Sequence, residues 1–375
     1  MNKRSQKNKI VTVLGTRPEI IRLSRILPLF DRYFAHTIVY TNQNYDKHLS
    51  TIFFKELALR KPEYLLDVKA KTLSEQIGNI LFQTEKVFIR EKPDAVFILG
   101  DTNSSLSAIV ARRLKIPLFH MEAGNRSFDR NVPEEVNRKI VDHISDYNIC
   151  YTEHSRRYLL AEGVAPEGIY VSGSPLPEVF THYSSEIESS LILQELQVKP
   201  EKYLLASIHR EENIDNDDNL RKLWKSLEKV ADFFSMQIIV SLHPRTKKRL
   251  ELLSIASSKS VRFVNPLGFF AYNKLQKNAY CVLSDSGSVP EESAILRFPA
   301  VQVRVSSERP EAYDKGVLTL SGFDKDAIIT AVEIARDPMH KEADILPVDY
   351  RDLHVSLKVL KLVHGLTSIR RAQRI

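Results

Sequence analysis

The chain has 375 residues, of which 43% are hydrophobic and 27% charged, a balance typical of a globular protein large enough for two domains. No apolar run approaches the roughly 20 residues of a membrane helix, and the basic start lacks the apolar stretch of a secretion signal. The net charge of +7 is concentrated in the two tails, which leaves the body near neutral and argues against nucleic acid as a partner; the tail charges are Lys3, Arg4, Lys7, Lys9, Arg370, Arg371 and Arg374.

Short β-branched segments alternate with segments of helical periodicity along most of the chain. In the first half we predict strands at 9–15, 36–41, 94–100, 116–122, 147–152 and 169–173. In the second half we predict strands at 203–209, 237–243, 261–266, 280–285, 299–303 and 317–322. Helical spacing is clearest at 75–92, 219–234 and 356–366. Such alternation is typical of parallel sheets that helices cover on both faces.

This alternation runs through twice, with a linker-like stretch at 173–190. We therefore predict an α/β fold of two Rossmann-like domains that face one another, an N-terminal domain of residues 1–173 and a C-terminal domain of residues 174–355. The final helix, within 356–375, is expected to pack back on the first domain. Cys150 and Cys281 lie in apolar runs, so we expect buried thiols in a cytoplasmic protein and no disulfide.

Polar residues gather directly after the predicted strands. In doubly wound sheets, ligands bind outside the carboxyl ends of the strands. Two such edges that face each other would line a cleft between the domains, and we place the active site there. The residues concerned are Thr16, Arg17, Gln43, Asp101, Glu122, His209, Arg210, His243, Asp285, Ser286 and Gly287.

The first strand is followed by a turn and a helix, with Pro18 in the first helical turn. It is not a dinucleotide fingerprint, because Gly15 is the only glycine of the motif. Arg17 stands at the helix start and Arg22 one turn later. Taken alone, this pattern fits a capped helix with solvated arginines as well as it fits a phosphate contact.

A second strand-to-helix turn is a stronger candidate for a phosphate site. Ser286, Gly287 and Ser288 open its helix, whose N–H groups and dipole favour an anion. Glu292 on the same helix can accept hydrogen bonds from a ribose diol. A serine cap explains the same residues, but we favour phosphate because Arg309 follows one strand later as a second cation.

Two further strands end in a histidine followed closely by arginine, at His209 and His243. A lone histidine is usually structural, whereas two at equivalent strand ends favour contact with a substrate. Neither has a spacing typical of zinc sites, and the sequence has no D-x-D pair to hold magnesium. We therefore predict no metal site.

Acidic residues gather in the first half of the chain. Asp101 ends a strand before a serine-rich helix start, where a helix cap is by itself the commoner role. Glu122 ends another strand and Glu134 begins the following helix, so the two converge on one loop. Convergent carboxylates suit proton transfer if burial raises the pKa of one of them. Asp129 and Arg130, at the loop tip, are expected to be solvated.

Seven motifs occur in order: GTRPE, GDT, MEAG, PEE-x-NR, HRE, SDSG and ERPEA. Together they resemble the non-hydrolysing UDP-N-acetylglucosamine 2-epimerase family over essentially the whole chain after the basic N-terminus. Longer stretches, among them HMEAGNRSFD and HPRTKKR, resemble one branch, the UDP-2-acetamido-2,6-dideoxy-L-talose 2-epimerases. That branch makes UDP-N-acetyl-L-fucosamine for capsule polysaccharide and the O-antigen of lipopolysaccharide.

The resemblance implies two Rossmann-like domains of the GT-B type, usually in a homodimer, with the active site in the interdomain cleft. It implies inversion at C2 of a UDP-sugar without NAD or a metal. The C2 proton and UDP leave to give a glycal, and UDP re-adds after a proton reaches the opposite face of C2. Carboxylates can stabilise the oxocarbenium character of such a transition state.

Roles are carried over residue by residue. The acidic catalytic positions of the family match Asp101, Glu122 and Glu134, and its motif histidine matches His209. Its diphosphate and ribose contacts match Arg17, Ser286, Gly287, Ser288, Arg309 and Glu292, and we add Arg22 and His243 as expected substrate contacts. The resemblance leaves open which acid removes the C2 proton and which group returns it.

Three residues depart from the pattern. Arg22 stands where the UDP-N-acetylglucosamine epimerases commonly carry lysine, and arginine binds phosphate but is a poorer proton donor. Asn44 replaces a histidine of their second, allosteric UDP-sugar site, so we expect no such activation. Ser127 stands where the deoxysugar branch often has cysteine, a change for which we have no physical account.

The leading hypothesis is therefore C2 epimerisation of UDP-2-acetamido-2,6-dideoxy-L-talose to the fuco sugar. The same chemistry on UDP-N-acetylglucosamine, giving UDP-N-acetylmannosamine, is the close alternative. A GT-B glycosyltransferase and a non-catalytic nucleotide-sugar binding protein are further alternatives from other classes.

Overall fold

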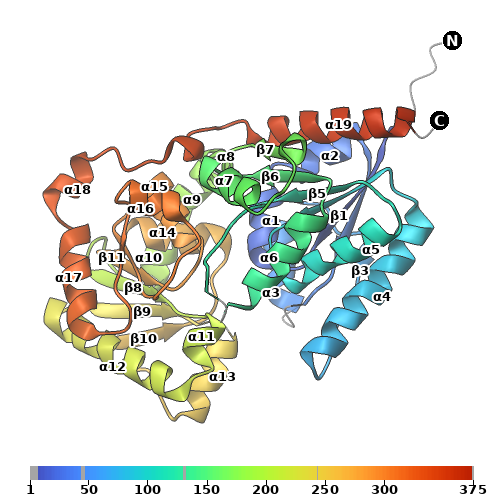
Figure 1. Cartoon of the computed structure of the whole chain (residues 1–375). Helices are drawn as coiled ribbons and strands as arrows, with labels where there is room; N and C mark the ends of the chain where they lie inside the picture. Colours follow the sequence, from blue (N-terminus) through green and yellow to red (C-terminus); the bar gives the residue numbers. More distant parts are fainter. Residues whose placement is uncertain (1–6, 44–46, 130–131, 243, 374–375) are drawn as a thin grey trace. The chain divides into compact units, whose positions relative to one another are not determined.

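The computed structural model describes residues 7–43, 47–129, 132–242 and 244–373, which divide into two compact units (Figure 1). The first unit comprises Met1–Arg126, Val132–Val179 and Arg351–Ile375, and the second comprises Ser127–Asn131 and Phe180–Tyr350. The main boundary thus falls after Val179, whereas the sequence predicts it after residue 173. The placement of the active site in a cleft between the domains stays a prediction.

Each unit is built on one parallel sheet. The seven-stranded sheet of the first unit has the order β3-β2-β1-β4-β5-β6-β7. Its strands are β1 Lys9–Leu14, β2 Ala35–Tyr40, β3 Tyr64–Leu65, β4 Ala95–Leu99, β5 Leu118–Met121, β6 Tyr147–Cys150 and β7 Ile169–Val171. The six-stranded sheet of the second unit has the order β10-β9-β8-β11-β12-β13. Its strands are β8 Tyr203–Ser207, β9 Gln237–Ser241, β10 Val261–Val264, β11 Cys281–Ser284, β12 Ala300–Gln302 and β13 Thr319–Leu320.

Helices connect successive parallel strands in both units. From the N-terminus to the unit boundary they are α1 Arg17–Leu23, α2 Leu27–Tyr33, α3 Lys47–Glu56, α4 Leu73–Glu91, the 3-10 helix η1 Asn103–Leu106, α5 Ser107–Arg113, α6 Pro133–Ile144, α7 Glu153–Ala161, the 3-10 helix η2 Pro166–Gly168 and α8 Leu176–His182. Those that follow are α9 Ser184–Ser189, α10 Ile192–Glu195, α11 Glu211–Ile214, α12 Asp217–Phe234, α13 Pro244–Leu252, α14 Phe269–Lys277, α15 Val289–Leu296, α16 Pro310–Asp314, α17 Lys325–Ala335, α18 Pro338–Glu342, the 3-10 helix η3 Val348–Tyr350 and α19 Val355–Gln373.

The core of the second unit lies on both faces of its sheet. Leu204 and Ala206 of β8 point into a cluster with α12 and α17, whereas Tyr203 and Leu205 point into another with α14 and α15. Successive residues of a strand face opposite sides of a sheet, so a strand buried on both faces is apolar throughout. This is why the sequence shows continuous apolar runs here instead of strict alternation. The predicted fold class, α/β with two parallel sheets, is confirmed.

The predicted strand segments each contain a strand, but two features of the fold differ from prediction. The two-residue strand β3 was not predicted, because it is too short to produce a sequence pattern. The linker predicted at 173–190 is instead occupied by α8 and α9. Val179, Tyr183 and Ile187 recur at every fourth position and are at most 4% exposed. Their burial against the rest of the fold stabilises these helices, although the polar residues between them make the segment resemble a linker in the sequence.

The last helix, α19, belongs to the first unit and contacts α2. Ser356 donates its backbone N–H to Glu178 Oε2 at 2.8 Å, and Arg370 pairs with Asp146 at 3.1 Å. Both cysteines, Cys150 and Cys281, are buried, as predicted. Within the described part of the chain, no helix is long and apolar enough to cross a membrane.

Candidate active site

In each sheet the strand order reverses between two neighbours, β1 and β4 in the first unit and β8 and β11 in the second. Ligands of doubly wound sheets bind outside the carboxyl ends of the strands at such a reversal. In the first unit, the turn after β1 carries Arg17 and the turn after β4 carries Asp101. In the second unit, His209 follows β8 and Ser286 follows β11. The predicted site residues therefore lie at the edges where this fold binds ligands.

The turn after β1 requires glycine. A Cβ atom on Gly15 would lie 1.9 Å from Ser104 Oγ and 2.2 Å from Thr41 Oγ1, so both hydroxyls would have to move to admit a side chain. These two hydroxyls are themselves hydrogen-bonded at 2.6 Å. The absence of a side chain at Gly15 thus lets the β1 turn pack directly on η1, next to Asp101.

Asp101 follows β4 and is held by α6. Its carboxylate pairs with Arg138 at 2.7 Å, and its carbonyl oxygen accepts a hydrogen bond from Asn137 at 3.0 Å. The side chain is 22% exposed, so it remains open to a ligand. The cap position of η1 is occupied by Thr102, and the helix-cap interpretation of Asp101 is wrong. The Asn and Arg of the PEE-x-NR motif therefore position an acid of the GDT motif.

Glu122 follows β5 directly and has a backbone φ of +69°, in the left-handed region that is costly for a residue with a Cβ. Its carboxylate accepts a hydrogen bond from Asn125 at 3.3 Å and lies 3.9 Å from Arg22 Nε. A Cβ on Gly100 would lie 3.6 Å from Glu122 Oε2. The turns that carry Asp101 and Glu122 are therefore adjacent.

Glu134 is the second residue of α6, after Pro133, and is half-buried. A carboxylate in the first helical turn is favoured by the helix dipole. The neighbouring Glu135 is buried and pairs with Arg138 at 3.2 Å, so it helps to orient that arginine. The helix that carries Glu134 is thus the one that holds Asp101 in place.

Sequence reasoning missed Glu19, the acid of the GTRPE motif. It is 2% exposed, and its carboxylate accepts hydrogen bonds from Gly15 N at 2.6 Å and from the Thr16 and Thr102 hydroxyls at 2.8 Å each. Burial raises the pKa of Glu19 to about 7, against the opposing effect of these hydrogen bonds. This carboxyl ties the β1 turn to the residue after Asp101. Only its place in the motif could have indicated it.

The two predicted arginines of the first unit have different surroundings. Arg17 is half-buried and its guanidinium lies 5.5 Å from the centre of the Phe53 ring. Arg22 is 4% exposed and lies over the Tyr151 ring at 5.4 Å, beside Glu122. Arg22 therefore lies beside Glu122, one of the predicted catalytic acids.

In the second unit, the buried Asp285 organises the turn of the HRE motif. It accepts hydrogen bonds from His209 N at 3.1 Å, Arg210 N at 2.9 Å and Asn213 Nδ2 at 2.8 Å, and lies 3.1 Å from His209 Nδ1. Burial works to raise the pKa of Asp285, but His209 and the hydrogen bonds hold it below its usual range. Asp285 thereby orients the His209 ring, whose side chain is 34% exposed.

The helix start after β11 has the predicted form. α15 begins at Val289 with Pro290 in its first turn, after Ser286, Gly287 and Ser288. Ser288 occupies the cap position without making a capping hydrogen bond. Its hydroxyl donates to Glu292 Oε1 at 2.7 Å instead, and Gln276 donates to the other carboxylate oxygen at 2.7 Å. The simple serine cap is therefore wrong, and Glu292 is held at the helix start.

Gly287 makes a close approach to a buried ion pair. A Cβ there would lie 2.1 Å from Glu308 Oε1 and 2.8 Å from Arg210 Nη2. Arg210 and Arg304 both pair with Glu308, at 2.7 and 2.9 Å. Two cations therefore share one carboxylate next to the helix start.

For the remaining predicted residues, the structure either shows surroundings other than those expected or gives no description. Arg309 is 2% exposed and pairs with the buried Glu291 at 3.0 Å, so its contact with phosphate stays a prediction. His243 and Arg130 lie outside the described residues, as does Asn44. Asp129 was expected to be solvated, but it is half-buried and accepts a hydrogen bond from Ser306 at 3.4 Å.

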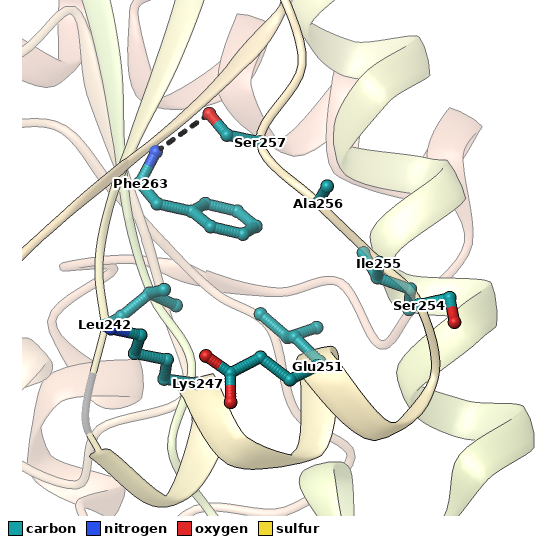
Figure 2. Close-up of a pocket in the computed structure, with 9 residues that line it drawn as sticks. Leu242, Lys247, Glu251, Ser254, Ile255, Ala256, Ser257 and Phe263 are labelled. Carbon is teal, nitrogen blue, oxygen red and sulfur yellow. Dashed lines mark hydrogen bonds between the residues drawn. The ribbon is translucent and has the colours of Figure 1, made fainter.

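Figure 2 shows a pocket of about 410 Å³ in the second unit, which contains none of the predicted site residues. It lies between α13 and the segment that leads to β10, and most of its lining is apolar. The residues that line it are Leu242, Lys247, Leu250, Glu251, Ser254, Ile255, Ala256, Ser257 and Phe263. This pocket is therefore distinct from the candidate active site.

The two units offer complementary chemistry. The first presents carboxylates on adjacent turns, with Arg138 and Arg22 as their partners. The second presents a helix start beside Arg210 and Arg304, the kind of arrangement that binds phosphate groups. Together they define a class of protein with two doubly wound domains, one suited to proton transfer and the other to a nucleotide.

Comparison with known proteins identifies the family. The pattern of the UDP-N-acetylglucosamine 2-epimerase family matches residues 30–364. The UDP-N-acetylglucosamine 2-epimerase of Methanocaldococcus jannaschii is 40% identical over 87% of this chain and 92% of its own length. The UDP-2,3-diacetamido-2,3-dideoxy-D-glucuronate 2-epimerase of Pseudomonas aeruginosa is 32% identical over 89% and 93%.

Solved structures agree. A structure of UDP-N-acetylglucosamine 2-epimerase from Rickettsia bellii has a TM-score of 0.89 and 43% identity, covering 97% of this chain and 98% of the other. The M. jannaschii enzyme in complex with UDP-GlcNAc and UDP has a TM-score of 0.89 and 36% identity, covering 95% and 99%. The chain belongs to the UDP-N-acetylglucosamine 2-epimerase family. It is accordingly an enzyme of the nucleotide-sugar 2-epimerase class.

Proposed function

We propose that this enzyme inverts C2 of a UDP-2-acetamido sugar by eliminating and re-adding UDP. The observation that carries the proposal is the adjacency of the turns that bear Asp101 and Glu122, each acid with an arginine partner. Glu134 lies on α6, the helix whose Arg138 pairs with Asp101. Carboxylates fixed in this way can act on a carbon acid only if the substrate is held rigidly. The second unit supplies the groups that hold it.

The reaction balances without an external oxidant. A carboxylate accepts the C2 proton while the bond between C1 and the UDP oxygen breaks, and UDP keeps the bonding electron pair. The product of this half-reaction is a glycal with a double bond between C1 and C2. A proton then reaches C2 from the opposite face as the UDP oxygen re-forms its bond to C1. The carboxylates stabilise the positive charge that develops on the sugar ring.

The diphosphate is assigned to the second unit. Ser286, Gly287 and Ser288 precede α15, whose first-turn N–H groups have no partner within the helix. Glu292 is oriented by Ser288 and Gln276 so that its carboxylate can accept hydrogen bonds from a ribose diol. His209, oriented by Asp285, is the remaining proposed substrate contact from the second unit.

Two sugars are candidates. The names of several relatives favour UDP-N-acetylglucosamine as the substrate. The HMEAGNRSFD and HPRTKKR stretches and the buried Arg22 beside Glu122 favour UDP-2-acetamido-2,6-dideoxy-L-talose, and we propose this sugar, with capsule or O-antigen as the destination. The R. bellii and M. jannaschii enzymes carry names that fit the alternative, and the two proposals differ only in the sugar.

Incubation of the purified enzyme with each UDP-sugar in deuterated water decides between them. Deuterium is expected at C2 of the true substrate and of its epimer, seen by proton NMR as loss of the C2 signal. Exchange into UDP-N-acetylglucosamine but into neither 6-deoxy sugar would overturn the choice of sugar and leave the reaction type intact. A glycosyltransferase would give transfer to an acceptor, and a binding protein would give no exchange at all.

The homodimer implied by the resemblance is a separate proposal. Light scattering coupled to size-exclusion chromatography measures the mass of the particle directly. A mass of twice the 43.0 kDa of one chain is expected. A monomer that epimerises its substrate at full rate would show that the proposed homodimer is wrong.

A further inference from the structure

A buried polar cluster lies behind the two turns that carry Asp101 and Glu122. Its members are His120, Asp142 and Arg126, and their side chains are 0% exposed. None of them can touch a substrate. A buried group of charges is costly unless each member has a partner, so the contacts of this cluster decide what it does.

His120 lies on β5, two residues before Glu122. Its Nε2 atom lies 2.9 Å from the carbonyl oxygen of Gly100, the residue before Asp101. Its Nδ1 atom lies 2.9 Å from Asp142 Oδ1. Both ring nitrogens thus lie close to oxygen atoms, one of a carbonyl and one of a carboxylate, and such oxygens favour a proton on the nitrogen that faces them. Burial works to lower the pKa of His120, but Asp142 and the Gly100 carbonyl raise it above its usual value.

Asp142, on α6, connects His120 to the second turn. Its two carboxylate oxygens accept from Gly124 N at 3.3 and 3.2 Å, and Gly124 follows Glu122 by two residues. Arg126 donates to Asp142 Oδ2 at 2.7 Å and makes two hydrogen bonds to Glu162, at 2.8 and 2.6 Å. Arg126 thus pairs with both carboxylates, and Asp142 also lies beside the His120 ring.

The turns that this cluster holds are conformationally demanding. Gly100, Glu122 and Gly124 have φ values of +78°, +69° and +80°. A residue with a Cβ stays in that region only when its surroundings determine its conformation. The His120–Asp142 pair contacts the backbone on both sides, at Gly100 and at Gly124.

We propose that the His120–Asp142 pair is a positioning device that sets the separation of the Asp101 and Glu122 carboxylates. The inference rests on the proposed function, because the separation of the two carboxylates affects the rate only if both act on the same sugar. His120 fixes the start of the Asp101 turn through its Nε2 proton. Asp142 fixes the end of the Glu122 turn through the N–H of Gly124 and lies against Nδ1 of His120.

Two substitutions separate the contacts. In His120→Gln the amide nitrogen replaces Nε2 and can still reach Gly100, whereas in His120→Asn it replaces Nδ1 and can still reach Asp142. A displacement of a catalytic group by roughly 1 Å costs about 100-fold in rate. We therefore expect kcat for epimerisation to fall about 100-fold in both variants and in Asp142→Asn. The dissociation constant of UDP is expected to stay within about twofold, because neither member of the pair belongs to the second unit, which carries the proposed diphosphate contacts.

The chain offers a matched control in the same sheet. His36, the second residue of β2, also has a side chain that is 0% exposed, with Nδ1 2.6 Å from Asp31 Oδ1 and Nε2 2.9 Å from Thr12 Oγ1. It lies near the amino end of its strand, away from the acid-bearing turns. His36→Gln should lower the unfolding temperature much as His120→Gln does while leaving kcat unchanged.

The outcomes are distinguishable. Wild-type enzyme that shows no C2 exchange with any UDP-2-acetamido sugar overturns the proposed function itself. Wild-type exchange together with normal kcat in folded His120→Gln and Asp142→Asn overturns only the positioning proposal. Equal loss of kcat in His36→Gln would also overturn it, since general destabilisation would then explain the effect. If His120→Gln fails to fold, His120→Asn and Asp142→Asn are read by the same criteria.

Discussion

Replacement of Glu19 by glutamine tests the electrostatics of the β1 turn quantitatively. Burial raises the pKa of this carboxyl from 4.5 to about 7, so between those values the folded chain binds a proton that the unfolded chain has lost. Stability is then full below the lower pKa and is lost as pH rises through about 7. A shift of this size lowers the free energy of unfolding by about 3 kcal/mol at pH 8 and by roughly 1 kcal/mol at pH 5.

Glutamine keeps the hydrogen bonds without the charge. Its carbonyl oxygen can accept from Gly15 N, and its NH₂ group can donate to the Thr16 and Thr102 hydroxyls. Glu19→Gln should therefore gain stability over wild type by about 2 to 3 kcal/mol more at pH 8 than at pH 5. Urea unfolding should be followed by circular dichroism, because the single tryptophan, Trp224, lies in the second unit. Glu85→Gln, at an exposed position of α4, is the control. A difference that does not change with pH would refute the reasoning.

Further substitutions test the division of roles between the units. Glu122→Gln and Glu134→Gln should each lower C2 exchange by at least about 100-fold with UDP affinity retained, measured by NMR and calorimetry; a parallel loss of UDP binding would contradict the assignment. Ser286→Ala should weaken UDP binding by roughly threefold to tenfold through one lost hydrogen bond, and an unchanged dissociation constant would remove that contact. Gly287→Ala should lower both UDP affinity and the unfolding temperature, because its Cβ would lie 2.1 Å from a buried carboxylate oxygen; a stable variant with normal affinity would show that the ion pair yields easily. Asp285→Asn should reduce kcat by releasing the ring of His209, and a variant with wild-type kcat would show that this orientation is not needed.

The sheets could be predicted because strands buried on both faces must be apolar throughout. β8 shows this directly, with Leu204 and Leu205 buried on opposite sides of the sheet. The helices α8 and α9 could not, since their apolar residues are few and their burial depends on contacts with distant segments. Phe180, for example, stacks on Phe269, far along the chain.

The site was predictable only in part. Strand-end positions indicated Asp101, Glu122 and the turn at Ser286 as candidates, because parallel strands bring their carboxyl ends to one edge. The motif sequence could not reveal that Glu19 is buried, nor that Arg309 faces Glu291, since both depend on how separate elements pack. Nor could it show that one histidine contacts the turns of two acids.

The central claim is that carboxylates of the first unit remove the C2 proton as UDP departs. A substrate with a heavy-oxygen label in the bond between C1 and the diphosphate tests it most directly. If UDP leaves and returns, the label must become distributed among the oxygens of the terminal phosphate, at a rate comparable with deuterium entry at C2. Deuterium entry with the label fixed in its original position would mean that the bond to UDP never breaks, and the account would be wrong.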